Sequence, residues 1–229
     1  MRILGIESSS LVASVAIVTD QILTAEYTTN LKKTHSQTLL PMIDEMIEML
    51  EIELDTIDAI AVSGGPGSFT GLRIGASTAK GLGLALNKPL IHVPTVDAMA
   101  YNFYSVANLI CPIMDARRNQ VYTGLYRFED SFQIVRSQCA ISLEELISAL
   151  NEGKDRVIFL GDGVPVYRDV IGETLKVPYR FAPAHLNRQR AGAVAALGMV
   201  YYEQGNLENA REFSPDYLRK SQAERERGM

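Results

Sequence analysis

The sequence predicts an α/β protein built from two similar lobes. Its 229 residues suffice for one large domain or two small ones, and 47% of them are apolar, which is ordinary for a globular chain. Two blocks succeed one another, each with three strand-like runs followed by a helix and a further strand. This repetition predicts duplicated βββαβα lobes over residues 1–105 and 106–229, with the last segment returning toward the first lobe.

The first block opens with three strands. Runs rich in Val, Ile and Ala predict strands over residues 2–8, 11–19 and 22–29, and the short turns between them favour an antiparallel meander. Apolar side chains three or four residues apart then predict a helix over residues 35–50. Pro41 is expected near the first turn of that helix, or as the cause of a kink.

A glycine-rich run follows the next strand, which is predicted over residues 59–63. The run spans residues 64–71 and leads into a long helix that ends near Leu86. A strand over residues 90–94 comes next, and Thr95 is suited to cap a helix over residues 96–104.

The second block repeats this order. Strands are predicted over residues 109–115, 120–128 and 132–140, and Ser142 with Glu145 forms the capping box of a helix that runs to Leu150. A strand over residues 157–160, a turn at Gly161-Asp162-Gly163, an irregular stretch and a helix over residues 187–204 complete the chain. The whole order is typical of actin-like and sugar-kinase-like proteins, in which two similar lobes flank a cleft.

The net negative charge lies in the first lobe. The chain has 22 basic and 27 acidic side chains, and residues 1–103 alone account for the formal charge of −5. This balance disfavours a strongly basic nucleic-acid-binding domain. Two interpretations of the acidic run remain, a solvated helix face with its following loop or a docking surface for a basic partner. The run comprises Asp44, Glu45, Glu48, Glu51, Glu53, Asp55 and Asp58.

Several features favour a cytoplasmic protein that does not contact a membrane. Cys111 and Cys139 lack the CxxC spacing, which predicts buried reduced thiols. Met1 leads into a short strand-like run that contains Glu7, unlike a signal peptide. The longest uncharged stretch, residues 98–114, is too short and too polar to span a bilayer.

Three loops are candidates for phosphate binding. The serines between the first two strands can form an anion-binding nest, and the glycine run precedes a helix N-terminus, where exposed N–H groups favour anions. The run lacks the Gly-Lys-Ser/Thr ending of a P-loop, so a tight structural turn is the favoured interpretation there, and a plain polar turn is equally open for the serines. The candidate residues are Ser8, Ser9, Ser10, Gly65, Gly67, Ser68, Gly161 and Gly163.

Small residues and methionines mark two helices as candidates for a partner interface. Gly71, Gly75, Ala79 and Gly83 recur every four residues, and each glycine costs about 1 kcal/mol of helix propensity relative to alanine. Close approach of another backbone explains that cost, either from the chain's own sheet or from another subunit. Methionine suits adaptable surfaces, although a core role is also open. The first helix contributes Leu39, Met42, Ile43, Met46 and Met49.

No catalytic residue or metal site is predicted. His35, His92 and His185 include no pair at helical ligand spacing, and the sequence has no nucleophile elbow. Asp115 lies beside Arg117 and Arg118 at a hairpin, where a salt-bridged turn is the expected arrangement.

Four sequence blocks, in order, resemble the TsaB family of the glycoprotease-like proteins. They are ILGIESS from Ile3, HSQTLLP from His35, GPGSFTGLRIG from Gly65 and PIMDAR from Pro112, and a weaker mark, PDYLR, begins at Pro215. The third block is the most specific. The resemblance implies a two-lobed actin-like fold of the ASKHA, ribonuclease H-like type. It also implies a supporting role in making threonylcarbamoyladenosine in tRNA.

The resemblance implies the partners as well. The family's catalytic paralogue, TsaD, carries two histidines four residues apart, whereas this chain has His35 followed by Leu39. Family members pair with TsaD through the first two helices, assisted by the ATPase TsaE, and reach tRNA through the complex. We therefore expect a non-catalytic subunit that does not bind a cofactor alone, with ATP or ADP bound only in the assembled complex.

Two further expectations follow from this assignment. The same helices are expected to form a homodimer when TsaD is absent. A Gly75→Leu change is expected to abolish pairing with the paralogue while the monomer stays folded. The alternative function is an ATP-dependent small-molecule kinase of the same architecture, with residues 8–10 and 161–163 as phosphate loops.

Overall fold

The computed structural model describes residues 1–31 and 34–219 and divides them into two compact units. The first unit contains Met1–Ala98 together with the described residues from Gln189 onward, and the second contains Met99–Arg188. The chain therefore passes into the second unit earlier than the predicted boundary at residue 105. Residues 189–219, predicted as the end of the second lobe with its last segment returning toward the first, belong to the first unit.

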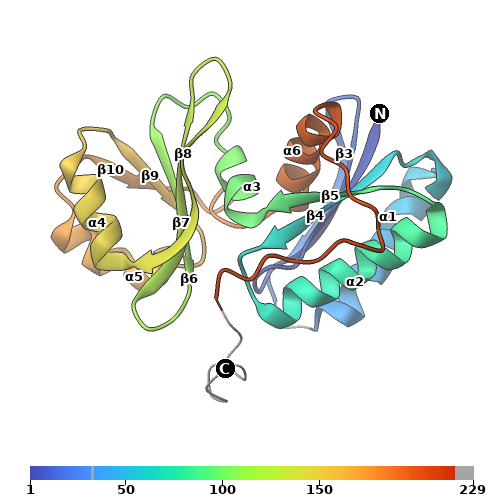
Figure 1. The fold of residues 1–229 in the computed structure, drawn as a ribbon, viewed down its shortest axis with the longest axis horizontal. Coiled ribbons are helices and arrows are strands. Elements are labelled where there is room, and N and C mark those ends of the chain that lie inside the picture. Colours follow the sequence, from blue (N-terminus) through green and yellow to red (C-terminus); the bar gives the residue numbers. More distant parts are fainter. Residues whose placement is uncertain (32–33, 220–229) are drawn as a thin grey trace. The chain divides into compact units, whose positions relative to one another are not determined.

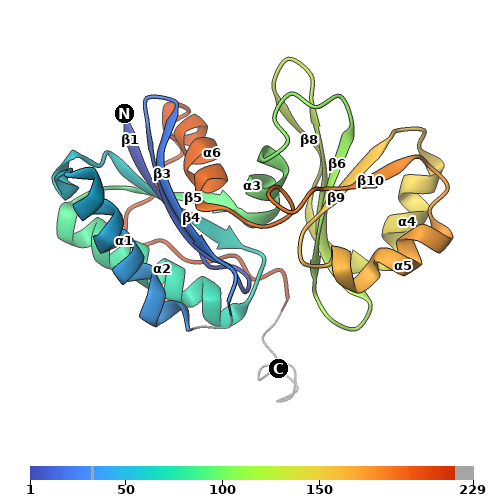
Figure 2. The ribbon, with the colours of Figure 1, turned by 180° about the vertical axis from the view of Figure 1, so that it is seen from behind.

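The first unit is a five-stranded sheet covered by helices on both faces (Figures 1 and 2). β1 pairs with β2 antiparallel and with β4 parallel, which gives the strand order β3-β2-β1-β4-β5. Helices α1 and α2 lie side by side on one face, and α6 covers the other. The elements are β1 (Arg2–Glu7), β2 (Ala13–Thr19), β3 (Ile22–Thr29), α1 (His35–Leu50), a 3-10 turn (Leu54–Thr56), β4 (Ala59–Gly65), α2 (Phe69–Leu86), β5 (Leu90–Pro94) and α6 (Ala191–Glu203).

The second unit repeats this topology. Its strand order, β10-β9-β6-β7-β8, becomes that of the first unit when β6 takes the place of β1 and β9 that of β4. The predicted duplication is thus confirmed by strand order as well as by element order. The elements are β6 (Leu109–Asp115), β7 (Gln120–Phe128), β8 (Phe132–Ser142), α4 (Leu143–Glu152), β9 (Val157–Leu160), α5 (Val164–Thr174) and β10 (Tyr179–Phe181).

Helix α5 and strand β10 fill the stretch that was predicted to be irregular. Val164, Tyr167 and Ile171 form the buried face of α5, and a proline lies in its first turn, where the missing N–H costs little. The three- and four-residue spacing of these apolar side chains was already visible in the sequence. Helix α3 (Thr95–Tyr101) also ends earlier than predicted. The predicted cap of α4 is confirmed, because Ser142 Oγ accepts a hydrogen bond from the Glu145 N–H at 3.0 Å.

Helix α6 brings the end of the chain back to the first unit. Gly198 lies against Ala61 of β4, where an added Cβ would stand only 2.6 Å from the alanine Cβ. At the start of the helix, Arg190 forms an ion pair with Glu26 of β3. Residues 206–217 then run back along α2, and we call them the C-terminal strap.

The two thiols differ in environment. Both are free, but Cys111 is fully buried in β6, and burial raises its pKa to about 12, whereas Cys139 is partly exposed. The prediction that both are buried is therefore wrong for Cys139. None of the helices in the described part of the chain is long and apolar enough to cross a bilayer.

Alkylation with iodoacetamide at pH 8 is expected to modify one thiol per native chain, at Cys139. With a pKa of about 12, only about one Cys111 in ten thousand is a thiolate at pH 8, and its burial blocks access. Peptide mass spectrometry identifies the site, and urea is the control that exposes Cys111. Equal labelling of both thiols in the native protein would contradict this expectation.

Candidate partner-docking surface

Most of the residues predicted to contact a partner lie inside the first unit. On α1 and α2 the predicted stripe faces the chain's own sheet, so these side chains are unavailable to another subunit. The prediction is wrong for the six buried residues Leu39, Ile43, Met46, Gly71, Gly75 and Ala79. Of the remaining two, Met42 is half-buried and Met49 is exposed.

The inward glycines of α2 are needed for packing within the chain. A Cβ at Gly71 would overlap the Ser8 carbonyl oxygen, and one at Gly75 would overlap Ser8 Oγ. That hydroxyl is fixed, because it donates to the Gly71 carbonyl at 2.9 Å. Close approach to the chain's own sheet therefore explains the four-residue repeat, and we now expect Gly75→Leu to destabilise the monomer itself.

A second set of residues faces outward from the same two helices. On α1, Met49 is 67% exposed and Leu40 is 51% exposed, and on α2 Leu84 is 51% exposed. Ser77, Gly81 and Ala85 follow at four-residue spacing on the exposed side of α2. We call these six residues the outer α1–α2 surface.

Gly81 is the unusual member of this surface. A Cβ added there would meet no described atom within 4 Å, in contrast to the crowded Gly75. Glycine in a helix interior costs about 1 kcal/mol relative to alanine, and nothing in the chain's own packing offsets that cost. Sequence spacing alone did not single out this residue, because the inward repeat is longer and richer in glycine.

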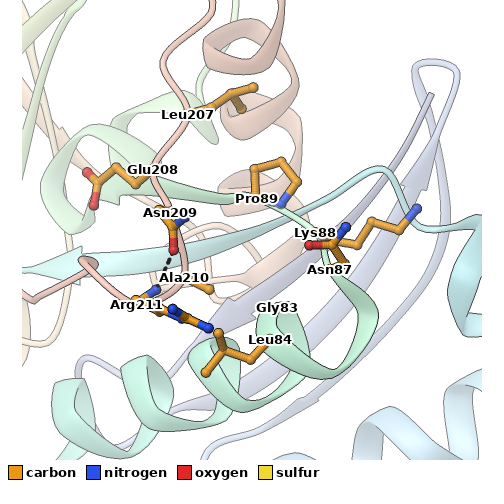
Figure 3. Close-up of a pocket in the computed structure, with 10 residues that line it drawn as sticks. All are labelled: Gly83, Leu84, Asn87, Lys88, Pro89, Leu207, Glu208, Asn209, Ala210 and Arg211. Carbon is orange, nitrogen blue, oxygen red and sulfur yellow. Dashed lines mark hydrogen bonds between the residues drawn. The ribbon is translucent and has the colours of Figure 1, made fainter.

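The C-terminal strap borders α2 and forms a pocket at its end. Leu90 and Glu208 exchange backbone hydrogen bonds of 2.9 Å, and Lys80 Nζ donates to the carbonyl oxygens of Arg211 and Phe213. Figure 3 shows the resulting pocket of about 460 Å³ between the end of α2 and residues 207–211 of the strap. Leu84 of the outer α1–α2 surface is one of its lining residues.

The structure brings the two predicted phosphate loops of the first unit together, but their polar groups bind each other. Ser9 donates from both its N–H and its Oγ to Glu7 Oε1, and its carbonyl oxygen accepts the Ser68 N–H at 2.6 Å. Ser68 Oγ caps α2 by accepting the Gly71 N–H.

The other candidate residues of these two loops also contact neighbouring residues of the chain. Ser10 Oγ accepts the Val12 N–H, while a Cβ at Gly67 would overlap the Ser9 carbonyl oxygen. Gly65 adopts a φ of +115° with its Cα against the Asp216 carbonyl oxygen. These contacts favour the interpretation as a tight structural turn, and phosphate binding by these loops stays a prediction.

The glycine turn of the second unit is internal too. The Gly161 N–H donates to the Asn187 carbonyl oxygen at 2.8 Å, and the Gly163 N–H donates to that of Ile113 at 3.0 Å. Gly161 has a φ of +110°, which explains the glycine there. The Gly163 amide therefore ties the end of β9 to β6, and the Gly161 amide ties it to the segment that precedes α6.

His35 has a structural role at the start of α1. Its Nε2 lies 2.8 Å from the Ser10 carbonyl oxygen, which can only accept, so Nε2 carries the proton. Four residues later, Leu39 lies in the hydrophobic core. Within residues 1–31 and 34–219, no three His, Cys, Asp or Glu side chains gather in a way that would hold a metal ion.

The hairpin between β6 and β7 does not form the predicted salt bridge. Asp115 Oδ1 accepts the Arg117 N–H at 2.9 Å and the Tyr167 hydroxyl at 3.0 Å. Among the described residues, no carboxylate lies within 4.0 Å of either the Arg117 or the Arg118 guanidinium. Instead, the Asp115 carboxylate stabilises the turn by accepting the backbone N–H of Arg117.

Comparison with known proteins identifies the family. A family model described as TsaD, tRNA N6-adenosine threonylcarbamoyltransferase, matches residues 23–227. The chain is 33% identical to the tRNA threonylcarbamoyladenosine biosynthesis protein TsaB of Bacillus subtilis, over 98% of this chain and 96% of that protein. The chain belongs to the TsaB family.

Solved structures agree with this assignment. A Pseudomonas aeruginosa protein described as similar to the peptidase YeaZ is 25% identical, with a TM-score of 0.80 over 95% of this chain and 99% of that one. The ROK hexokinase of Thermus thermophilus, 10% identical over 89% of this chain and all of that one, has a TM-score of 0.50. The fold of this TsaB family member is thus the two-lobed actin-like one.

Proposed function

We propose that this chain is a non-catalytic subunit in the synthesis of threonylcarbamoyladenosine in tRNA. It binds and supports a TsaD-like catalytic paralogue, together with a TsaE-like ATPase. The complex transfers a threonylcarbamoyl group from threonylcarbamoyl-AMP to N6 of the adenosine next to the anticodon. Membership of the TsaB family and the match to the TsaD family model support this role.

The position of Leu39 supports a non-catalytic role. In the catalytic paralogue a second histidine stands four residues after the first, whereas here that position belongs to the hydrophobic core. His35 itself donates to the Ser10 carbonyl oxygen at the start of α1. These two residues therefore stabilise the first unit in place of ligating a metal.

Gly81 is the observation that carries the docking proposal. An exposed glycine in mid-helix, flanked at four-residue spacing by Ser77 and Ala85, lets a second helix approach α2 closely. Packed helices lie about 8–10 Å apart, and the smallest side chains give the shortest separation. The exposed Leu84, three residues after Gly81 on the same helix, supplies apolar area beside this groove.

A TsaD-like partner suits this surface because its family model also matches this chain, so the two share a plan with corresponding helices. The exposed acids of α1, among them Asp44, Glu45 and Glu48, favour a partner with a basic rim. Without that partner, a second copy of this chain is the expected occupant of the same surface.

The test combines association with activity. Gly81→Leu is expected to abolish co-elution with the TsaD-like protein and to remove the stimulation of tRNA modification, because the new side chain projects from the docking surface. The matched control is Gly172→Leu, which changes an exposed glycine of α5 in the second unit. Binding measured at several salt concentrations also tests the contribution of the acids.

Two results would refute the assignment. Co-elution that survives Gly81→Leu would place the interface elsewhere. Modification of tRNA that proceeds equally well without this chain would exclude the supporting role itself.

A further inference from the structure

The hairpin between β6 and β7 has an unusual backbone. Arg117, Arg118 and Asn119 have φ angles of +64°, +58° and +57°, three successive residues in the left-handed region. This conformation costs about 1–2 kcal/mol per residue for ordinary side chains, although asparagine tolerates it well. Two arginines are therefore held where smaller or more tolerant residues would be less strained.

Both arginines project into solvent with their charges unpaired. They are exposed, and among the described residues no carboxylate is within ion-pair distance. Other arginines behave differently, since Arg127 pairs with Asp155 and Arg136 with Glu145. The one acid in the hairpin, Asp115, is turned toward the Arg117 N–H and the Tyr167 hydroxyl.

The acids near the hairpin leave these cations available. Asp162 lies at the end of β9, where burial raises its pKa and the opposing charge of Arg188 partly offsets that rise. Glu144 is exposed beside the hairpin, but lies beyond 4.0 Å of both guanidinium groups. Glu129 and Asp130 stand at the far end of β7, about 30 Å away for nine residues of strand.

A mostly apolar groove begins at the hairpin. It has a volume of about 420 Å³ and lies between α4 and α5, with Asn119 at one end. Leu143, Ile147, Tyr167 and Val170 supply its apolar lining, and Ser142, Glu144 and Thr174 line it as well. Arg117 and Arg118 directly precede Asn119, so two cations adjoin this groove in the hairpin, at the edge of the sheet where the parallel strands β6 and β9 end.

We propose that this hairpin binds RNA directly, with Arg117 and Arg118 on backbone phosphates and an unstacked base in the groove. The proposal rests on the proposed function, which brings tRNA to the complex. Guanidinium groups suit phosphate oxygens, and an unpaired base has the flat apolar faces that such a groove accepts. The first unit holds the partner, and the second contacts the nucleic acid.

The experiment titrates an unmodified tRNA transcript against the chain alone and against its complex with the TsaD-like protein and the ATPase. The variant is Arg117→Asn with Arg118→Asn, because asparagine keeps the left-handed turn while removing both charges. The control is Lys154→Ala with Arg156→Ala, which removes two exposed charges at the start of β9, on the opposite edge of the sheet.

The asparagine variant is expected to weaken tRNA binding about tenfold and to lower the slope of log affinity against log salt by about 2, for two lost phosphate contacts. The control should stay within about twofold of wild type. Co-elution with the TsaD-like protein should be unchanged in both variants, which separates loss of the RNA contact from loss of the subunit interface.

Three results would overturn the RNA contact. They are unchanged affinity in the asparagine variant, equal losses in both variants, and a wild-type chain that binds tRNA in neither form. Mg-ATP that binds the wild-type chain but not the asparagine variant would make the hairpin a site for free nucleotide instead. Failure of the wild-type chain to join the complex would refute the proposed function, while the titration of the chain alone still tests the hairpin.

Discussion

Replacing Gly75 with leucine is expected to destabilise the first unit strongly. A side chain there overlaps Ser8 Oγ, and the hydroxyl has no room to move because it donates to the Gly71 carbonyl oxygen. Forcing a large side chain into such a contact separates α2 from β1 and lowers the free energy of unfolding by about 3 kcal/mol or more. Thermal unfolding followed by circular dichroism should show a midpoint lowered by roughly 10 °C.

Gly81→Ala is the matched control on the same helix. Its Cβ meets no described atom within 4 Å, so the monomer should gain up to about 1 kcal/mol from the better helix propensity of alanine. The pair of variants separates the two faces of α2, one fixed by the sheet and one open to a partner. A Gly75→Leu protein that melts within a few degrees of wild type would show that the inward face is not tightly packed.

Truncating Phe213 to alanine is expected to release the C-terminal strap. The ring is 2% exposed in the core of the first unit and lies 5.7 Å from the His92 ring, centroid to centroid. Removing a buried phenylalanine costs about 3–5 kcal/mol. The strap has other attachments, including the Asp216 N–H to the Gly64 carbonyl oxygen at 2.7 Å and the small buried side chain of Ala210, but Phe213 is its largest buried side chain.

Limited proteolysis measures the release. Cleavage between residues 205 and 217 should be much faster in Phe213→Ala than in wild type, with the free energy of unfolding lowered in parallel. Leu207→Ala is the control, since Leu207 is 41% exposed and its loss should cost less than about 0.5 kcal/mol. A wild-type cleavage pattern in Phe213→Ala would mean that hydrogen bonds alone hold the strap.

Helices and strands with a regular spacing of apolar residues could be predicted from the sequence, whereas those with a weak or interrupted spacing could not. Helix α1 begins and ends where its apolar spacing indicates, and the two triplets of strands lie at nearly the predicted positions. Helix α5 was missed although Val164, Tyr167 and Ile171 mark one face, because the prolines and glycines around it favour irregular structure. The return of α6 to the first sheet depends on contacts between residues far apart in the chain.

The candidate interface on α2 shows more clearly that residue spacing alone does not tell which face of a helix is buried. The sequence places small residues on two stripes of α2, and both satisfy a four-residue repeat. Only the position of Ser8, more than sixty residues earlier, decides that the Gly71–Gly75 stripe faces inward. The stripe through Gly81 is exposed, and it is the one that we propose for a partner.

By itself the sequence determined the duplicated α/β plan and the family, because local periodicity and short motifs carry that information. The tertiary structure decided which faces of those helices are free, that the phosphate loops bind themselves, and that Arg117 and Arg118 are unpaired. Those properties depend on the atoms that meet each side chain, and these come from distant parts of the chain.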